Sequence, residues 1–220
     1  MKYIFSLLAS GILLMSGNAR GQTATLNVNT LEAVSVQMSI EKNGVKVIKD
    51  SSVKDADEPT FAKVKNSDFR NGTITVKVLS KLLKDAPKTS RGFIGIAFRI
   101  NPENNKFEAI YIRPTNGRAE DQLRRNHAIQ YFSYPNYTYD RLRNESPGVY
   151  ESYADMDLNE WITMKIVVKE NQAKLFLNGN KQPSLIVSDL KHGPDASGGI
   201  GLWVDVGTEG YFKDLKIVKE

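Results

Sequence analysis

Apolar and polar residues alternate in short runs along most of the chain, and turn-forming residues separate the runs. In 162–168 and 173–177 the apolar side chains recur at every second position, which is the period of a strand with one buried face. The pair Glu170-Asn171 lies between these runs, so together they predict a hairpin. The other segments that predict strands are 33–40, 44–49, 72–79, 92–100, 106–113, 127–134, 183–190, 198–206 and 211–218.

Many short strands at this spacing predict an all-β fold, a two-sheet antiparallel jelly-roll sandwich. No long stretch has the period of a helix, and a short helix is expected only within 50–64 or around 80–83. One domain is expected over residues 25–220, because roughly 200 residues are enough for a single core. Residues 25–70 either complete the sandwich or cover it.

The N-terminus has the pattern of a secretory signal peptide. Lys2 precedes an apolar run over 3–15, which is too short to cross a hydrocarbon core of roughly 30 Å as a helix. Small residues predict cleavage near 19–24, so 1–22 is assigned to the signal and no membrane span is expected after cleavage. The predicted location is therefore outside the cytoplasm, either periplasmic or extracellular. The absence of cysteine excludes a disulfide framework and a lipid-modified cysteine.

The formal net charge of +5 is a modest excess for this length, and it argues against a nucleic-acid partner, which requires a clustered basic face. The composition changes sharply between Lys106 and Lys165. This interval has no lysine, yet it contains six of the ten arginines and seven of the nine tyrosines. Its polar stretches 113–126 and 135–160 are longer than most loops, and long loops on a compact domain tend to be functional.

The segments "NEWITMKIVVKENQAKLFLNGNKQPSLIV", "GGIGLWV" and "GYFKDLKIV" resemble the concanavalin A-like lectin/glucanase superfamily. In particular they resemble laminin-G-like and 3-keto-disaccharide-hydrolase-like exported bacterial domains, best over residues 92–218. The resemblance implies a concanavalin A-like jelly roll that holds or processes sugars on its concave face. Laminarinase-like members carry the strand motif Glu-x-Asp-x-x-Glu, whereas Glu108 has no acid two or five positions on. Cleavage by two carboxylates from one strand is therefore not supported.

The leading hypothesis is a carbohydrate-binding domain that recognises a polar or anionic glycan. Arginine offers two-pronged hydrogen bonding to carboxylates and vicinal hydroxyls, and tyrosine rings pack on the C–H face of a sugar. The candidate ligand-binding residues are Tyr111, Arg113, Asn116, Arg124, Arg125, His127, Gln130, Tyr131 and Tyr150.

Two other functions stay open. One is an enzyme that acts on glycosidic bonds, as the 3-keto-disaccharide-hydrolase resemblance implies, with Glu108, Asp121 or His127 as acid or base. Glu108 would be structural if it pairs with Arg99, and otherwise it is the best carboxylate for catalysis. The other is a protein-binding laminin-G-like module. A bowl lined by arginine and tyrosine would favour a sugar, whereas a flat apolar patch would favour a protein partner.

His127 also has two interpretations. If the strand already includes it, His127 shares one face with Ile129 and Tyr131, and Gln130 lies on the other. If the strand face that carries Ile129 packs on the core, His127 is a residue at the boundary of the core. If that face is open to solvent, His127 is part of the site.

No metal or other cofactor is expected. His127 and His192 are the only histidines of the chain, which is too few for an ordinary zinc site. Calcium held by Asp205, Glu209 and loop carbonyls is the remaining option for a metal.

Overall fold

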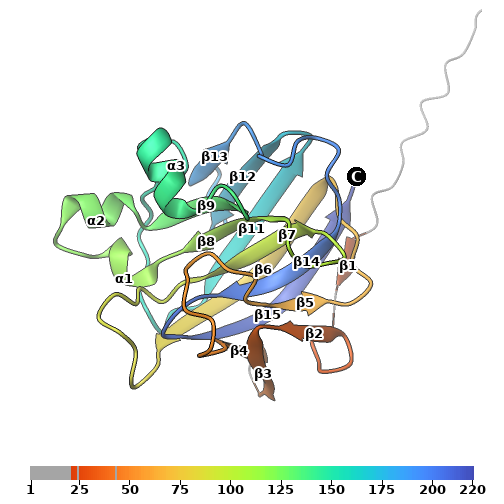
Figure 1. Cartoon of the computed structure of the whole chain (residues 1–220), viewed down its shortest axis with the longest axis horizontal. Coiled ribbons are helices and arrows are strands. Elements are labelled where there is room, and N and C mark those ends of the chain that lie inside the picture. The colour runs from red at the N-terminus through yellow and green to blue at the C-terminus, as the bar shows by residue number, and fades with distance from the viewer. Residues whose placement is uncertain (1–20, 24, 43) are drawn as a thin grey trace, which may run out of the picture.

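The computed structural model describes residues 21–23, 25–42 and 44–220, and its strands form two antiparallel sheets (Figure 1). The first sheet has the order β13-β12-β11-β6-β15-β4-β3, and β1 pairs with β15 beside this path. Its strands are β1 (Gly21–Thr23), β3 (Val36–Glu41), β4 (Gly44–Lys49), β6 (Gly72–Leu82), β11 (Ile162–Lys169), β12 (Gln172–Leu177), β13 (Leu185–Val187) and β15 (Thr208–Lys219).

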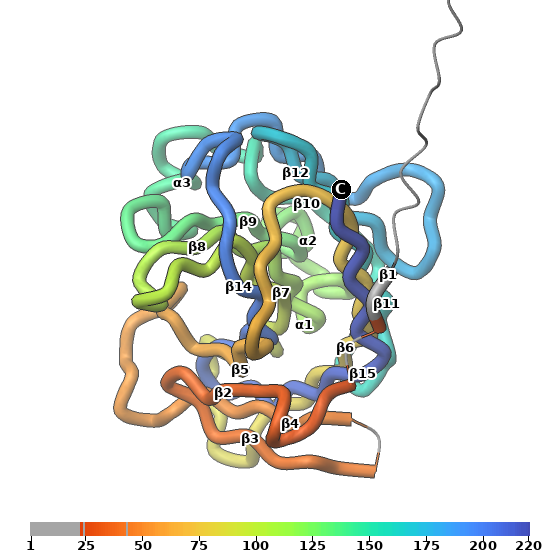
Figure 2. The backbone as a smooth tube through the Cα atoms, turned by 90° about the vertical axis from the view of Figure 1, so that its right-hand side faces the viewer, coloured from red at the N-terminus to blue at the C-terminus, as the bar shows by residue number. Residues whose placement is uncertain are grey.

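The second sheet has the order β10-β9-β8-β7-β14-β5-β2 and lies against the first (Figure 2). The all-β, two-sheet prediction is confirmed, and so is the β11–β12 hairpin. Residues 25–70 supply strands to both sheets, so they complete the sandwich. The strands of the second sheet are β2 (Leu31–Val34), β5 (Phe61–Val64), β7 (Ile94–Ile100), β8 (Phe107–Ile112), β9 (Ile129–Tyr134), β10 (Glu151–Ser152) and β14 (Gly199–Val204).

Three short helices lie together at one end of the sandwich, at the left of Figure 1. They are α1 (Pro114–Gly117), α2 (Gln122–Asn126) and α3 (Tyr139–Glu145), and all three occur in stretches expected to be loops. The prediction of a short helix at 50–64 or around 80–83 was wrong. Residues 61–64 form β5, and residues 80–82 are the end of β6, so both segments pair with neighbouring strands. In the part of the chain that the structure describes, no helix is long and apolar enough to cross a bilayer. Residues 1–20 of the predicted signal lie outside that part.

The predicted strand 33–40 is divided between the two sheets. Ser35 has a φ of 49°, in the left-handed region, and the chain turns there. As a result β2 pairs with β5 in the second sheet, whereas β3 pairs with β4 in the first. Alternation continues through Ser35 in the sequence, so the break has no apolar signal.

The core fills the space between the sheets, and the second sheet is also buried on its outer face. All six residues of β8 and all six of β14 are buried, which explains why these segments are almost continuously apolar. An aromatic cluster covers the outer face, with Trp203 between Tyr111 at 4.7 Å and Phe132 at 5.3 Å, measured between ring centroids. Segment 50–60 closes over this cluster, and Trp203 Nε1 donates a hydrogen bond to the carbonyl oxygen of Glu58 at 2.9 Å.

Gly95 makes room for Tyr111 on this outer face. The two residues are opposite each other on β7 and β8. A Cβ atom at Gly95 would lie 2.5 Å from the Cβ of Tyr111, which is closer than real Cβ contacts. The absence of that atom lets the Tyr111 ring lie across the sheet, with Arg113 next to it on the same face.

Candidate functional site

A cavity of about 630 Å³ lies beside the three helices, where residues of the helical stretches and of the aromatic cluster line it together. Its volume is in the range of small-molecule sites. The walls combine guanidinium groups, aromatic rings and a few other polar side chains. The lining residues are Ala56, Thr89, Arg91, Phe93, Tyr111, Arg113, Asn116, Asp121, Leu123, Arg124, His127, Tyr139, Arg143, Asp205 and Val206.

The local structure of 113–127 directs the side chains of Arg113 and Asn116 toward one point, the carbonyl oxygen of His127. Arg113 follows the last residue of β8, and Pro114 then begins α1, where a proline needs no backbone N–H. The Asp121 side chain caps α2 by accepting a hydrogen bond from the backbone N of Arg124 at 2.7 Å. His127 ends that helix, and its carbonyl oxygen accepts from both Arg113 Nη1 at 2.9 Å and Asn116 Nδ2 at 3.1 Å.

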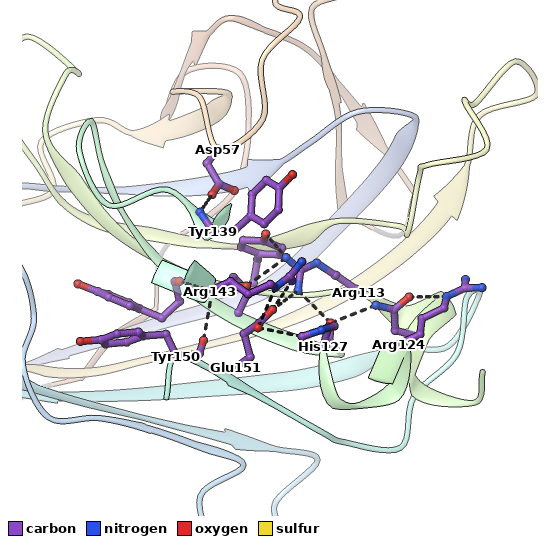
Figure 3. A network of polar contacts seen from close by, with 12 residues as sticks. Asp57, Arg113, Arg124, His127, Tyr139, Arg143, Tyr150 and Glu151 are labelled. Carbon is purple, nitrogen blue, oxygen red and sulfur yellow. Dashed lines mark hydrogen bonds and ion pairs between the residues drawn. The ribbon is translucent and has the colours of Figure 1, made fainter. Parts of the chain in front are cut away.

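Glu151 is the centre of the polar network beside the cavity (Figure 3). Its side chain is only 3% exposed and accepts two hydrogen bonds from Arg143, through Nε at 3.1 Å and through Nη2. Arg113 Nη1 lies 3.4 Å from Oε1, and His127 Nδ1 lies 2.8 Å from Oε2. One buried carboxylate thus holds two guanidinium groups by hydrogen bonds, and it lies within ion-pair distance of an imidazole whose Nδ1 makes no hydrogen bond with a described residue.

His127 presents one free nitrogen to the cavity. Nδ1 is the nitrogen next to Glu151, whereas Nε2 makes no hydrogen bond or ion pair with any described residue. Burial lowers the pKa of His127 below its usual value, and the nearby charges of Arg143 and Arg113 lower it further against the opposing effect of Glu151. The imidazole is therefore neutral at neutral pH, and its unprotonated nitrogen can accept a proton.

Arg113 is a buried positive charge with several partners. Its Nη2 donates to the hydroxyl of Tyr111 at 2.7 Å and to Oε1 of Gln130 at 3.2 Å. The guanidinium carbon also lies 4.9 Å from the centroid of the Tyr111 ring. Burial raises the pKa of Tyr111 well above its usual value, so this hydroxyl keeps its proton.

Asp57 is a fully buried carboxyl group behind the aromatic wall of the cavity. The backbone N of Tyr139 donates to its Oδ2 at 2.6 Å, whereas Oδ1 has no partner among the described residues. Burial raises the pKa of Asp57 to about 7, and the neighbouring Asp205 contributes in the same direction. Asp57 therefore carries a proton over much of the acidic range.

This raised pKa predicts a pH-dependent effect of Asp57→Asn. The unfolded pKa is near 3.8, so stability from the protonated form is lost as pH rises from about 4 to about 7. Asparagine does not ionise, and we expect its free energy of unfolding relative to wild type to be clearly higher at pH 8 than at pH 5. Urea unfolding at both pH values measures this. A difference that is the same at pH 5 and pH 8 would contradict the buried, protonated carboxyl.

Comparison with known proteins places this site in a family. Residues 21–218 match the 3-keto-alpha-glucoside-1,2-lyase-like domain. The chain belongs to this family. No curated protein matches the sequence significantly.

Solved structures share the fold of this lyase-like domain at low sequence identity. The carbohydrate binding module CBM66 from Bacillus subtilis has a TM-score of 0.58 at 12% identity, with 86% of this chain and 95% of that chain covered. A "putative glycosyl hydrolase" from Parabacteroides distasonis has a TM-score of 0.57 at 13% identity, with 91% and 100% covered. The concanavalin A-like resemblance stated from the sequence is confirmed at the level of fold.

The lyase-like domain brings five of the nine predicted ligand-binding residues to the cavity and leaves four outside it. Arg125 extends toward the hydroxyl of Tyr153, to which its Nη2 donates at 2.8 Å. Gln130 is buried beneath Arg113, and the hydroxyl of Tyr150 donates to Asp189 away from the cavity. The five residues that line the cavity are Tyr111, Arg113, Asn116, Arg124 and His127.

Tyr131 and Glu108 lie between the sheets, so neither faces a ligand. Both are fully buried, and the Tyr131 hydroxyl donates to Glu108 Oε2. The backbone N of His192 donates to Glu108 Oε1 at 2.8 Å, whereas Arg99 donates to other residues. The side chains of β8 and β9 alternate between the two faces of the sheet, as their sequences predict. The face that carries Ile110 and Tyr131 is the one that packs against the first sheet. The proposed roles of Tyr131 as a ring contact and Glu108 as a catalytic acid are therefore corrected.

The interpretation of His127 as a strand residue was also wrong. It caps the end of α2, and β9 begins only at Ile129. Because His127 lies before the strand, the direction of its side chain is not set by the alternation that places Ile129, and its side chain points to Glu151. Sequence reasoning missed Glu151 and Arg143 as site residues, although both lie in the polar stretch 135–160. Arg91 and Asp57 were missed because nothing near them in the sequence has a distinctive pattern.

The carboxylates suggested for calcium make other interactions. Asp205 is ion-paired with Lys49 and accepts a hydrogen bond from the backbone N of Asp57 at 3.1 Å. Glu209 accepts from the hydroxyl of Tyr211. Within residues 21–23, 25–42 and 44–220, no group of three or more histidine or acidic residues is arranged to hold a metal ion.

Proposed function

We propose that the domain binds a 3-keto-α-glucoside in the cavity and cleaves it by elimination across C1 and C2 of the sugar. The observation that carries this proposal is the neutral His127, with Nδ1 beside Glu151 and Nε2 open to a cavity rich in arginine. A positioned imidazole of this kind is suited to act as a general base. The family description supplies the reaction class.

The chemistry needs a base and a group that stabilises negative charge. A ketone at C3 makes the C2 proton acidic, and His127 Nε2 takes that proton while negative charge moves to the C3 oxygen. The C3 carbonyl then reforms, a C1–C2 double bond appears, and the C1–O bond to the aglycone breaks. The proton on His127 goes to the departing oxygen, so the products are an unsaturated 3-keto sugar and an alcohol.

Arg143 is placed to stabilise the charge on the C3 oxygen. Two of its nitrogens bind Glu151, and Nη1 has no hydrogen-bond partner among the described residues. Its guanidinium carbon lies 5.3 Å from the centroid of the Tyr139 ring, which together with Tyr111 offers an aromatic wall for the sugar. A fixed donor aimed at developing charge is a large contribution in many enzymes.

Hydrolysis by two carboxylates is less well supported by the same cavity. The acids among its lining residues are Asp121 and Asp205. Asp121 caps α2, and Asp205 is ion-paired with Lys49. A glycosidase of that type needs one acid free to donate and another free to attack or activate water.

Methyl 3-keto-α-glucoside in D₂O tests the proposal. We expect release of methanol, an unsaturated sugar product seen by mass spectrometry, and deuterium at C2 of any product formed by rehydration. Methyl α-glucoside is the matched control and should stay intact, because its C2 proton is not acidic. A 3-keto sugar released with its original hydrogen at C2 would exclude elimination. Binding without turnover would make the domain a carbohydrate-binding module.

A further inference from the structure

The cavity contains more positive than negative charge. Glu151 is shared by Arg113 and Arg143, which leaves Arg91 and Arg124 on other parts of the wall. Neither Arg91 nor Arg124 is ion-paired with a carboxylate of any described residue. These two guanidinium groups therefore line the cavity without an ion-pair partner among the described residues.

Both side chains are held in place by uncharged oxygen atoms. Arg91 Nη1 donates to the carbonyl oxygens of Lys88 at 2.7 Å and Ser90 at 2.8 Å. Arg124 Nε donates to Oδ1 of Asn116 at 2.9 Å, and its Nη2 donates to Oγ1 of Thr115 at 3.1 Å. Each guanidinium keeps nitrogens that make no such bond, so donors remain available for a ligand.

The two arginines repel each other along the cavity wall. Burial lowers the pKa of Arg91, and the charges of Arg124 and Arg113 lower it further. Of the acids that line the cavity, Asp121 accepts a hydrogen bond from the backbone N of Arg124 and Asp205 is ion-paired with Lys49, so neither is ion-paired with the guanidinium group of Arg91 or Arg124. Placing an anion between the two guanidinium groups would supply the missing charge.

We propose that Arg91 and Arg124 form an anion subsite that takes the acidic substituent of a sugar substrate. This inference rests on the proposed function, because the sugar ring would occupy the same cavity, beside His127. The substituent is a carboxylate, as in a uronate, or a sulfate ester, since a guanidinium group binds either with two parallel hydrogen bonds. The substrate class is thus an acidic rather than a neutral glycoside.

Binding of matched sugars by isothermal titration calorimetry tests this subsite without requiring turnover. The probes are methyl α-D-glucuronide, glucose 6-sulfate and methyl α-D-glucoside, with sodium sulfate alone as the control for anion binding. We expect at least one acidic sugar to bind about ten- to a hundredfold more tightly than the neutral glucoside. The acidic sugar that binds best identifies the substituent, and its affinity should fall as salt is added.

The double variant R91Q/R124Q should abolish this preference, so that the acidic sugar binds no more tightly than the neutral glucoside. Arg125→Gln is the control, because Arg125 is adjacent in sequence but extends to Tyr153 outside the cavity. It should keep the full preference. Retention of the preference in R91Q/R124Q would overturn the subsite.

The remaining outcomes separate this inference from the proposed function. Equal affinity for neutral and acidic sugars would overturn the subsite alone and leave elimination on a neutral 3-keto-glucoside intact. Sodium sulfate binding as tightly as the best acidic sugar would show that the arginines bind any anion, which would overturn a role in sugar recognition. Absence of binding by all three sugars would overturn the subsite, whereas the methyl 3-keto-α-glucoside experiment would still decide the elimination.

Discussion

We expect His127→Asn to lower kcat/KM on a 3-keto-α-glucoside by about 10²–10⁴-fold, the usual contribution of a positioned general base. Asparagine can place its amide nitrogen where Nδ1 lies, 2.8 Å from Glu151 in the wild-type protein. It has no counterpart of Nε2, so the proton acceptor is lost while the contact to Glu151 is kept. Steady-state kinetics measure the effect, and the melting temperature should change by only a few degrees.

The other histidine of the chain provides the matched control. His192 Nε2 lies 2.9 Å from the carbonyl oxygen of Tyr134, and His192 does not line the cavity. His192→Asn should therefore retain wild-type kcat/KM. If His127→Asn were equally active, another group would have to be the base.

The pH dependence of the proposed activity in the wild-type protein should report the same group. Because the pKa of His127 is lowered from its ordinary value near 6.5, kcat/KM should rise through the mildly acidic range and be constant around neutral pH. The acidic limb should vanish in the residual activity of His127→Asn. If the acidic limb of the pH profile persisted in His127→Asn, the titrating group would be a residue other than His127.

Glu151→Gln should destabilise the fold by about 3–5 kcal/mol, because it removes the carboxylate from a buried cluster of positive charge. Arg113 is 5% exposed at its side chain and would keep its charge with no acid beside it. For a chain of this size the loss corresponds to a fall in melting temperature of roughly 6–20 °C. Urea unfolding and thermal melting both measure the change.

Glu160→Gln is the matched control for this substitution. Glu160 also pairs with an arginine, since Arg118 Nη1 lies 2.9 Å from its Oε1, but its side chain is 48% exposed. Exposed pairs of this kind contribute only about 0–1 kcal/mol. Equal stability of the two variants would show that Glu151 is not needed to balance the buried arginines.

The stability of this site and its proposed activity therefore depend on the same carboxylate. Glu151 neutralises part of the charge of Arg113 and Arg143 and also orients His127. Strand β10, on which it lies, is only two residues long and pairs with strand β9. The partial loss of this pairing would move Glu151 away from His127, the proposed base, without unfolding the two sheets, because the core lies between other strands.

Alternation of apolar residues is sufficient to locate most of the strands. Strands β7, β8 and β9 lie within the segments predicted over 92–134, and the hairpin of β11 and β12 agrees with its turn residues. These features are predictable because side-chain alternation and turn chemistry are local properties of the backbone. The resemblance to concanavalin A-like proteins then indicated how such strands are assembled.

The alternation of apolar and polar residues predicts which side chains share a face of a strand. Which of the two faces is buried between the sheets depends on where the other sheet packs. Tyr131 and Glu108 became core residues for this reason, whereas Tyr111 and Arg113 reached the cavity. The partnership of His127 with Glu151 joins the end of α2 to the short strand β10, and no periodicity marks either one. The sequence by itself thus determined the strands, the sandwich and the polar segments that surround the site. The tertiary structure decided which polar side chains converge, because convergence depends on the packing of those segments against the completed sheets.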